Sequence, residues 1–216
     1  MSVHVVLVRH GETAWSSQRR HTGRTDIPLN EEGRQLARWL GPALASMPGI
    51  DAALVLTSPL RRARDTCGLT GLGGRAVVDD DLVEWDYGEA EGRTTIEMRA
   101  EIPGWSVWTH ALRDGERIEQ VAARADRVLA RVRAHDGLSV LFSHAHLLRI
   151  LAARWCGLAV TEGRILTLDA ASLSILGHER DVAVIERWNV VQDRFIGWPG
   201  GAATISTMSA EGSPTV

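Results

Sequence analysis

The chain has 216 residues, of which 44% are hydrophobic and 24% are charged, and its formal net charge at pH 7 is −3. These values lie near the averages of soluble globular proteins, so they exclude a disordered chain and bulk nucleic-acid binding. On a scale of roughly 150 residues per domain, the length favours one domain with a small insertion. No apolar run reaches the roughly 20 residues that span a bilayer, so no membrane segment is expected.

The cysteines and the start of the chain indicate the cellular compartment. Cys67 and Cys156 lie far apart in the sequence and belong to no metal-ligand pattern. The chain starts on a strand-like run rather than on a basic and apolar leader. We therefore expect free thiols, a cytoplasmic protein and no bound metal.

Short apolar runs alternate with helix-like stretches along most of the chain. The runs contain β-branched residues, are typical of buried strands and cover residues 4–9, 52–58, 75–80 and 138–144. The helix-like stretches cover residues 31–46, 59–69, 114–135 and 145–158. We expect Pro59 in the first turn of the second helix. Such alternation predicts a mostly parallel α/β sheet.

The helix over residues 31–46 has the clearest boundaries. Asn30 is placed to cap its N-terminus, and Glu31 and Glu32 occupy the first turn, where the helix dipole favours negative charge. Helical spacing puts four apolar side chains on one face: Leu36, Trp39, Leu40 and Leu44. We expect this face to pack against the sheet.

The C-terminal part of the chain ends the sheet. Residues 164–189 alternate between apolar and polar side chains and contain the turn-like stretch GHERD, which predicts a hairpin. Residues 198–216 are rich in Gly, Ser and Thr, as is typical of a mobile tail. We therefore expect a single domain over residues 1–197, with a small insertion or cap at about residues 85–115, followed by this tail.

Chemically active side chains follow the expected strands. In open α/β sheets, ligands bind beyond the carboxyl ends of the strands. The residues found there are Arg9 and His10, then Arg61, Arg62 and Arg64, then Glu84, and finally His144 and His146. An imidazole nucleophile, guanidinium groups and a proton-donating carboxyl suit phosphoryl transfer to a side chain. Its transition state spreads negative charge over three oxygens, and its leaving alkoxide needs a proton.

Five ordered motifs carry a family resemblance: LVRHGETAW, HTGRTDIPLNEEGRQLA, TSPLRRARDT, LVEWDYGEAEG and LFSHAHLLR. They resemble the signatures of the histidine phosphatase superfamily, the phosphoglycerate-mutase-like group, over roughly residues 3 to 190. Within that group the chain is most similar to broad-specificity acid phosphatases and sugar-phosphate phosphatases. The resemblance implies a three-layer α/β/α sandwich around a mostly parallel sheet with an antiparallel edge.

The resemblance also implies a role for each residue at the strand ends. His10 is then the nucleophile that becomes phosphohistidine, and Glu84 is the proton donor. The phosphate pocket is completed by Arg9, Arg62 and His144. Arg62 is preferred over Arg61 because the family pattern Ser-x-Leu-x-Arg-Ala matches Ser58, Leu60, Arg62 and Ala63.

Around this pocket the resemblance implies a substrate-binding set that consists of Ser16, Thr22, Gly23, Tyr87 and Ala145. Ser16 stands where the mutases usually carry asparagine, so a hydroxyl replaces an amide donor toward the phosphate. Tyr87 belongs to an aromatic group with Trp85, Trp105 and Trp108. This group either lines a cap over the leaving group or closes a small core, and we expect the second arrangement for at least two members.

Residues beside the nucleophile have supporting roles. Gly11 is expected to let the chain turn sharply, so that Arg9 and His10 both face a phosphate. For Glu12 two roles remain open: holding an arginine or the imidazole in place, or capping the turn. His146 is left open as a site residue. The remaining histidines considered are interpreted as surface or capping residues: His21, His110, His135 and His178.

The implied function is that of a histidine-type phosphatase, a metal-independent phosphomonoesterase that hydrolyses small phosphorylated metabolites through phosphohistidine, without a cofactor. A cofactor-dependent phosphoglycerate mutase is the first alternative, but residues 93–118 lack the paired arginines of the mutase insertion. A non-catalytic domain that binds phosphorylated ligands is the second, but it needs no proton donor beside its anion site. The expected partner is a small phosphorylated metabolite, with neither nucleic acid nor membrane, and a homodimer is one possible assembly.

Overall fold

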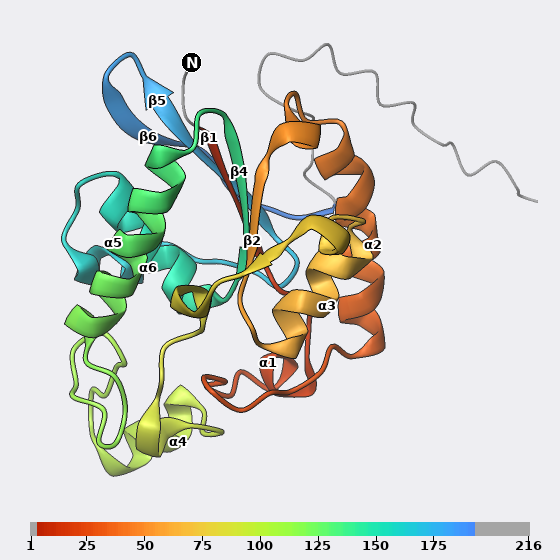
Figure 1. Cartoon of the computed structure of the whole chain (residues 1–216). Helices are drawn as coiled ribbons and strands as arrows, with labels where there is room; N and C mark the ends of the chain where they lie inside the picture. The colour runs from red at the N-terminus through yellow and green to blue at the C-terminus, as the bar shows by residue number, and fades with distance from the viewer. Residues whose placement is uncertain (1–3, 193–216) are drawn as a thin grey trace, which may run out of the picture.

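A six-stranded sheet forms the centre of the computed structural model, which describes residues 4–192 (Figure 1). Within this part of the chain the strand order is β3-β2-β4-β1-β5-β6. The strands are β1 (His4–Arg9), β2 (Leu54–Thr57), β3 (Val77–Val78), β4 (Leu138–Ser143), β5 (Leu173–Glu179) and β6 (Val182–Val190). The first four strands pair in parallel, whereas β5 is antiparallel to both β1 and β6. The predicted sheet, mostly parallel with an antiparallel edge, is confirmed.

Helices cover both faces of this sheet. α2 (Glu31–Ala45) and α3 (Arg61–Leu69) lie on one face, and α5 (Ile118–Ala134) and α6 (Ala145–Trp155) lie on the other (Figure 1). The shorter helices are α1 (Ala14–Ser17), α4 (Thr95–Glu101) and the 3-10 helices η1 (Ile50–Ala52), η2 (Gly73–Arg75), η3 (Asp80–Leu82), η4 (Gly88–Ala90) and η5 (Val160–Ile165). This arrangement confirms the predicted three-layer α/β/α fold.

Strand β1 shows why its sequence is apolar throughout. Val5 and Leu7 belong to the core shared with α5 and α6, whereas Val6 and Val8 belong to the core shared with α2 and α3. All of these side chains are at most 1% exposed. A strand that is buried on both faces has no solvent-facing side, so its polar chemistry is confined to its ends.

The helix predicted over residues 31–46 is confirmed as α2. The Asn30 side chain accepts a hydrogen bond from the N–H of Gly33 at 2.7 Å, as expected of an N-cap. Leu40 and Leu44 are fully buried against the sheet. The cap and the apolar face therefore both follow from the sequence.

Two predicted helix starts are wrong, and the backbone gives the reasons. α3 begins at Arg61 rather than at Pro59, because Leu60 is extended, with φ −68° and ψ 136°. α5 begins at Ile118 rather than at residue 114, because Asp114 has a left-handed φ of 59° that a helix cannot contain. In both cases the non-helical segment before the helix is longer than the sequence suggested.

The predicted C-terminal hairpin is confirmed but is shorter than expected. β5 begins at Leu173 because residues 160–165 form η5 and return the chain to the helical layer. The turn falls at Arg180 and Asp181, within the predicted stretch, and Arg180 has the positive φ of 57° that tight hairpin turns favour.

The segment at residues 85–115 lies beyond the carboxyl end of β1 and carries α4, and it forms the lobe at the lower left of Figure 1. The division into a single domain over residues 1–197, with this segment as a cap, stays a prediction. The tail predicted over residues 198–216 lies outside the described residues.

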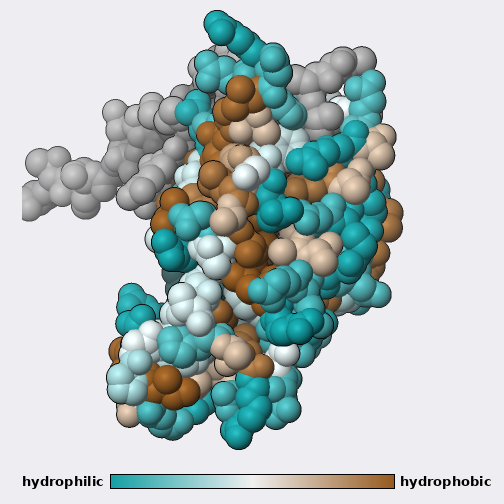
Figure 2. Space-filling view, turned by 90° about the vertical axis from the view of Figure 1, so that its left-hand side faces the viewer, coloured by the Kyte–Doolittle hydropathy of each residue, from teal (hydrophilic) through white to brown (hydrophobic). Residues whose placement is uncertain are grey.

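The surface over α5 and α6 shows a hydrophobic band between hydrophilic areas (Figure 2). In residues 4–192, no helix is both long and apolar enough to cross a membrane.

Cys67 is buried and Cys156 is half-buried, and both are free thiols as predicted.

Candidate active site

A cavity of about 570 Å³ lies where β1 ends, between the sheet and the α4 lobe. Of the predicted site residues, those that line it are Arg9, His10, Ser16, Thr22, Glu84, Tyr87 and Ala145. Three others do not belong to its wall: Gly23, Arg62 and His144. The predicted site therefore has one set of residues facing the cavity and another set behind it.

The chain beyond β1 is fixed to the neighbouring elements on two sides. The N–H of His10 donates to the carbonyl of Ser143 at 3.0 Å, and the N–H of Gly11 donates to the Thr66 hydroxyl of α3 at 2.9 Å. A Cβ at position 11 would collide with the backbone of Gly33 in α2. Because Gly11 has no positive φ, this close approach, and not the expected sharp turn, is the reason for glycine here.

His10 is held in one tautomer. Its Nδ1 lies 2.7 Å from the carbonyl oxygen of Gly11, and since a carbonyl can only accept, the proton is on Nδ1 and the lone pair is on Nε2. Burial lowers the pKa of His10 well below its usual value, and the positive charges of Arg62 and Arg9 lower it further. The ring is therefore neutral, with its lone pair on Nε2.

His144 follows β4 and carries the opposite tautomer. Its Nδ1 accepts a hydrogen bond from Nε of Arg62 at 3.1 Å, so its proton lies on Nε2, which donates to the Ser58 hydroxyl at 2.8 Å. Burial lowers its pKa well below the usual value, and the charge of Arg62 adds to this effect. The His10 and His144 rings lie with their centroids 5.1 Å apart.

Arg62 is fully buried in the first turn of α3. Besides its bond to His144, it donates to three carbonyls of the loop at residues 22–25, at 2.9–3.0 Å. The structure thus brings Arg62 beside His144 but turns its donors toward this loop and not toward the cavity. Arg61, by contrast, is exposed and pairs with Asp65 at 3.2 Å.

Arg9 is the predicted phosphate-binding arginine that faces the cavity. One of its Nη atoms donates to the carbonyl of Leu168, while its Nε is buried and has no hydrogen-bond partner among residues 4–192. Burial lowers the pKa of Arg9, and the nearby carboxylate of Glu84 opposes this shift, so the side chain remains a cation. Arg9 therefore brings positive charge to the cavity wall.

Glu84 is seated at the N-terminus of α6. Its Oε1 accepts hydrogen bonds from the N–H groups of Trp85 at 2.9 Å and Leu147 at 3.0 Å, and its Oε2 accepts one from the N–H of His146 at 3.0 Å. Backbone N–H groups at a helix N-terminus are placed to hold the oxygens of an acidic side chain by hydrogen bonds. The side chain is 3% exposed and lines the cavity, so its position is tightly defined.

The predicted substrate-binding residues before α2 make local contacts. The Ser16 hydroxyl bonds to the backbone of Thr13 and forms the capping box of α1. The Thr22 hydroxyl donates to a nearby carbonyl at 3.0 Å. The N–H of Gly23 is held by the Glu91 carboxylate at 2.9 Å, and this places Gly23 behind the cavity wall.

The aromatic group divides into two pairs. Trp85 and Trp105 are each 1% exposed and belong to the core, which confirms the expectation for at least two members. Tyr87 and Trp108 also belong to this core but line the cavity. The Tyr87 hydroxyl lies 2.6 Å from Nδ1 of His146, so the residue left open in the sequence belongs to the cavity wall.

Several residues of the cavity wall were missed by sequence reasoning, among them His21, Arg99 and Arg149. His21, interpreted as a surface residue, packs against Tyr87 with ring centroids 5.0 Å apart, and burial lowers its pKa to about 4. Arg99 comes from α4, which no periodicity predicted. Arg149 lies over the Trp108 ring, 4.7 Å from its centroid. Its position, one helical turn after the SHAH motif, was the available signal.

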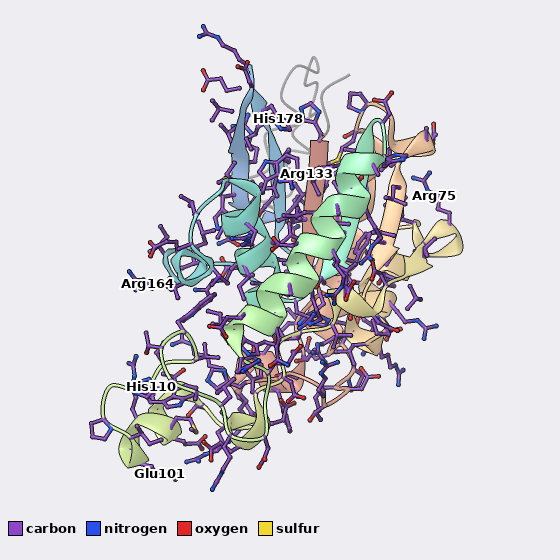
Figure 3. The ribbon with its side chains drawn as sticks, turned by 60° about the vertical axis from the view of Figure 1, so that its left-hand side comes forward. Arg75, Glu101, His110, Arg133, Arg164 and His178 are labelled. Atoms are coloured by element: carbon purple, nitrogen blue, oxygen red, sulfur yellow. The ribbon has the colours of Figure 1, made fainter. Side chains whose placement is uncertain are left out.

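The other histidines lie elsewhere, and Glu12 has a structural contact. His110 is on the α4 lobe, and His178 is at the opposite end of the molecule (Figure 3). The Glu12 carboxylate accepts a hydrogen bond from the side-chain amide of Asn30 at 2.7 Å. It therefore ties the loop after β1 to the cap of α2 and bonds to neither an arginine nor an imidazole.

The model of the histidine phosphatase superfamily (branch 1) matches residues 5–191, which include every residue of this site. The chain belongs to the histidine phosphatase superfamily. The resemblance read from the five motifs is thus confirmed. Among residues 4–192 of this histidine phosphatase, no group of three or more His, Cys, Asp or Glu side chains is arranged to hold a metal ion.

Curated relatives of this histidine phosphatase have several names. It is 42% identical over 180 residues to the acid phosphatase of Mycobacterium tuberculosis, and the match covers 82% of this chain and 88% of that protein. It is 35% identical over 185 residues to the sedoheptulose 1,7-bisphosphatase of Saccharomyces cerevisiae, covering 72% of this chain and 68% of that protein.

Solved structures give the same picture. The product of an open reading frame from Mycobacterium tuberculosis matches with a TM-score of 0.82 and 38% identity, covering 87% of this chain and 97% of that chain. A mycobacterial glucosyl-3-phosphoglycerate phosphatase, solved with VO3, matches with a TM-score of 0.77 and 30% identity, covering 86% and 98%. This histidine phosphatase therefore shares its fold with relatives over nearly their full length.

Proposed function

We propose that this histidine phosphatase is a metal-independent phosphomonoesterase that hydrolyses small phosphorylated metabolites through phosphohistidine. The observation that carries the proposal is the tautomer of His10. Its Nδ1 proton is engaged by the Gly11 carbonyl, so the neutral ring has a free electron pair on Nε2 at a cavity wall. A neutral imidazole with a fixed lone pair is an activated nucleophile at neutral pH.

The first chemical step forms a P–N bond and breaks the P–O bond to the leaving group. Nε2 of His10 attacks phosphorus, and Glu84 transfers a proton to the departing oxygen, which leaves as an alcohol. In the second step, water gives a proton to the Glu84 carboxylate and attacks phosphorus, which breaks the P–N bond. Phosphate is released, and both side chains return to their starting states.

The cationic groups around His10 balance the charge of the phosphoryl group. Arg9 lines the cavity beside His10 and is proposed to contact the phosphate oxygens directly through its guanidinium group. His144 is proposed to donate from Nε2, exchanging its bond to Ser58 for one to a phosphate oxygen. Arg62 acts from behind by fixing the proton of His144 on Nε2.

The remaining cavity wall is proposed to bind the leaving group. Its volume of about 570 Å³ suits a small metabolite, and its polar side chains offer donors to hydroxyl groups: His21, Thr95, Arg99, Ser106, His146 and Arg149. The names of the relatives, an acid phosphatase and a sugar bisphosphatase among them, support this substrate class. Among the predicted substrate-binding residues, Tyr87 and Ala145 are the members proposed to contact the leaving group.

A phosphoglycerate mutase remains the alternative, because probable phosphoglycerate mutases are 29% identical to this chain over 196 residues. Incubation with 3-phosphoglycerate and a bisphosphoglycerate primer separates the two activities: hydrolysis releases inorganic phosphate, and mutase activity releases an isomer. A cytoplasmic location and a homodimer also remain proposals. Free Cys67 and Cys156 are compatible with a reducing compartment.

The decisive test concerns Glu84. A general acid contributes about 10²–10⁴-fold when the leaving group is basic and little when it is not. We therefore expect Glu84→Gln to lower kcat/KM for a sugar phosphate about 10²–10⁴-fold, and for p-nitrophenyl phosphate less than about tenfold, since p-nitrophenolate leaves unprotonated.

The matched control is Glu89→Gln, which removes the same charge from a carboxylate that pairs with Arg113 at 2.7 Å and does not line the cavity. It should affect both substrates equally and weakly. Equal, large losses on both substrates in Glu84→Gln would remove Glu84 from the role of acid.

A further inference from the structure

Arg124 of α5 lies behind Glu84, outside the cavity wall. It is 8% exposed, and its Nε and one Nη donate to the two oxygens of Glu116 at 2.8 and 2.9 Å. A paired fork of this kind fixes the plane and direction of the guanidinium group. Arg124 is therefore aimed in one direction within the protein.

The remaining donors of Arg124 reach the backbone that precedes and includes the acid. Nη1 donates to the carbonyls of Asp81 and Val83, both at 2.8 Å, and Nη2 lies 3.5 Å from the carbonyl of Glu84. All five N–H donors of the guanidinium group thus have an acceptor. Three of these acceptors belong to the segment of residues 81–84.

Glu116 extends the same support to the residues after the acid. Its Oε2 accepts a hydrogen bond from the N–H of Asp86 at 3.0 Å, and its backbone carbonyl accepts one from Nε1 of Trp85 at 2.8 Å. Arg24, from the loop at residues 22–25, lies 3.6 Å from the same carboxylate. The Arg124–Glu116 pair therefore contacts the chain on both sides of Glu84.

From these contacts we infer that Arg124, acting through its fork to Glu116, is a positioning residue for proton transfer by Glu84. The inference rests on the proposed function, because it assigns to Arg124 the placement of the proposed acid. The backbone of residues 81–86 is held from the α5 side, and the carboxylate then meets the N–H groups of His146 and Leu147 on the α6 side. Arg124 does not line the cavity, so it acts only through Glu84.

A buried ion pair is not needed for stability alone. Apolar side chains of similar volume often replace such pairs without loss of stability, whereas removal of one partner is costly. An apolar residue at position 124 could fill the same space but could not bond to the carbonyls of Asp81, Val83 and Glu84. The guanidinium group therefore holds the backbone of residues 81–84 in place, and the position of this backbone determines where the carboxyl of Glu84 lies.

The test is Arg124→Lys, which keeps the charge but lacks the five-donor fork. We expect kcat for glycerol phosphate, whose leaving group is a basic alkoxide, to fall about 10–100-fold, with KM changed less than about threefold. For p-nitrophenyl phosphate, kcat should change less than about threefold. The loss falls on kcat because the cavity that binds substrate stays intact.

The matched control is Arg154→Lys. Arg154 of α6 forms an equivalent fork to Asp126 of α5, at 2.9 and 3.0 Å, and this fork lies outside the cavity wall. Within residues 4–192, neither side chain bonds to residues 81–84. Its replacement should not change the ratio of the two rates. If Arg124→Lys does not fold, Glu116→Gln provides the second variant, because it preserves the shape of the partner and weakens the fork.

The outcomes separate this inference from the proposed function. A Glu84→Gln variant with no leaving-group selectivity would overturn the acid itself. If Glu84→Gln is selective but Arg124→Lys or Glu116→Gln lowers both rates equally, the positioning role is wrong and the acid stands. In the double variant with Glu84→Gln, Arg124→Lys should add no further selectivity, and an added selective loss would also contradict the inference.

Discussion

His10 and His144 end two neighbouring parallel strands, β1 and β4, with ring centroids 5.1 Å apart. Both are buried, and in both the pKa is lowered well below its usual value, first by burial and then by arginine charge. They differ in what faces Nδ1. At His10 it is the carbonyl of Gly11, and at His144 it is the guanidinium group of Arg62.

This difference assigns opposite chemistry to two similar residues. A carbonyl only accepts and a guanidinium only donates, so Nε2 carries a lone pair in His10 and a proton in His144. In the proposed mechanism, one ring attacks phosphorus and the other donates to an oxygen of the same phosphoryl group. The neighbour of Nδ1, and not the position in the fold, determines the role.

The largest loss of turnover is expected for His10→Gln, and the same substitution at His144 provides the comparison. His10→Gln removes the only proposed nucleophile, and an amide cannot replace it. Turnover and phosphoenzyme formation should both be lost, as measured by phosphate release and by labelling with a radioactive phosphate ester. Acid-labile phosphate that persisted on this variant would contradict the assignment.

At His144 the same substitution should be tolerated better. His144→Leu removes the donor to the phosphoryl oxygens, so kcat should fall about 10²–10³-fold, as is typical when one such donor is lost. His144→Gln keeps an N–H group near the position of Nε2 and should recover part of this loss. Steady-state kinetics of the two variants provides the measurement. If Gln and Leu are equally inactive, the role of His144 is not that of a donor.

The smallest expected effect is on the pH dependence of the free energy of unfolding, because both rings are uncharged in the folded protein. Unfolded histidine titrates near pH 6.5, whereas the folded pKa of both rings is lower, so below about pH 6.5 the unfolded chain binds more protons. The free energy of unfolding should therefore decrease as the pH falls, by up to about 1.4 kcal/mol per pH unit for each histidine.

Urea unfolding at pH 7.5 and pH 5.5 measures this slope. His10→Gln and His144→Gln should each reduce it, because neither variant takes up that proton on unfolding. His21→Phe should also reduce it, over a window that ends near the folded pKa of about 4. An unchanged slope in all of these variants would mean that the rings are not held neutral.

The sequence predicts the parts of the site that follow from regular structure. Continuous apolar runs identify β1 and β4, and parallel pairing brings Arg9, His10 and His144 to one edge of the sheet. The cap of α2 by Asn30 was predicted for a similar reason, because it depends on neighbouring residues alone.

The tautomers and the cavity wall could not be predicted in this way. The direction of Arg62 depends on the carbonyls of an irregular loop at residues 22–25, which has no periodicity. Arg99 reaches the cavity because the segment at residues 85–115 carries α4 beyond the carboxyl end of β1. The path of this segment depends on tertiary contacts such as the packing of His21 against Trp105. The pattern of neighbouring residues in the sequence predicts neither the direction of Arg62 nor the path of residues 85–115.

Helix α3 is hydrogen-bonded to the surroundings of both His10 and His144. The hydroxyl of Thr66 donates to the carbonyl of Arg62, one turn earlier, and accepts the N–H of Gly11. Arg62 bonds to the His144 ring, and Thr66 bonds to the backbone of Gly11, beside His10. The same helix therefore contacts the surroundings of both histidines. A substitution that displaces α3 is therefore expected to change the positions of both the attacking and the donating nitrogen of the proposed mechanism.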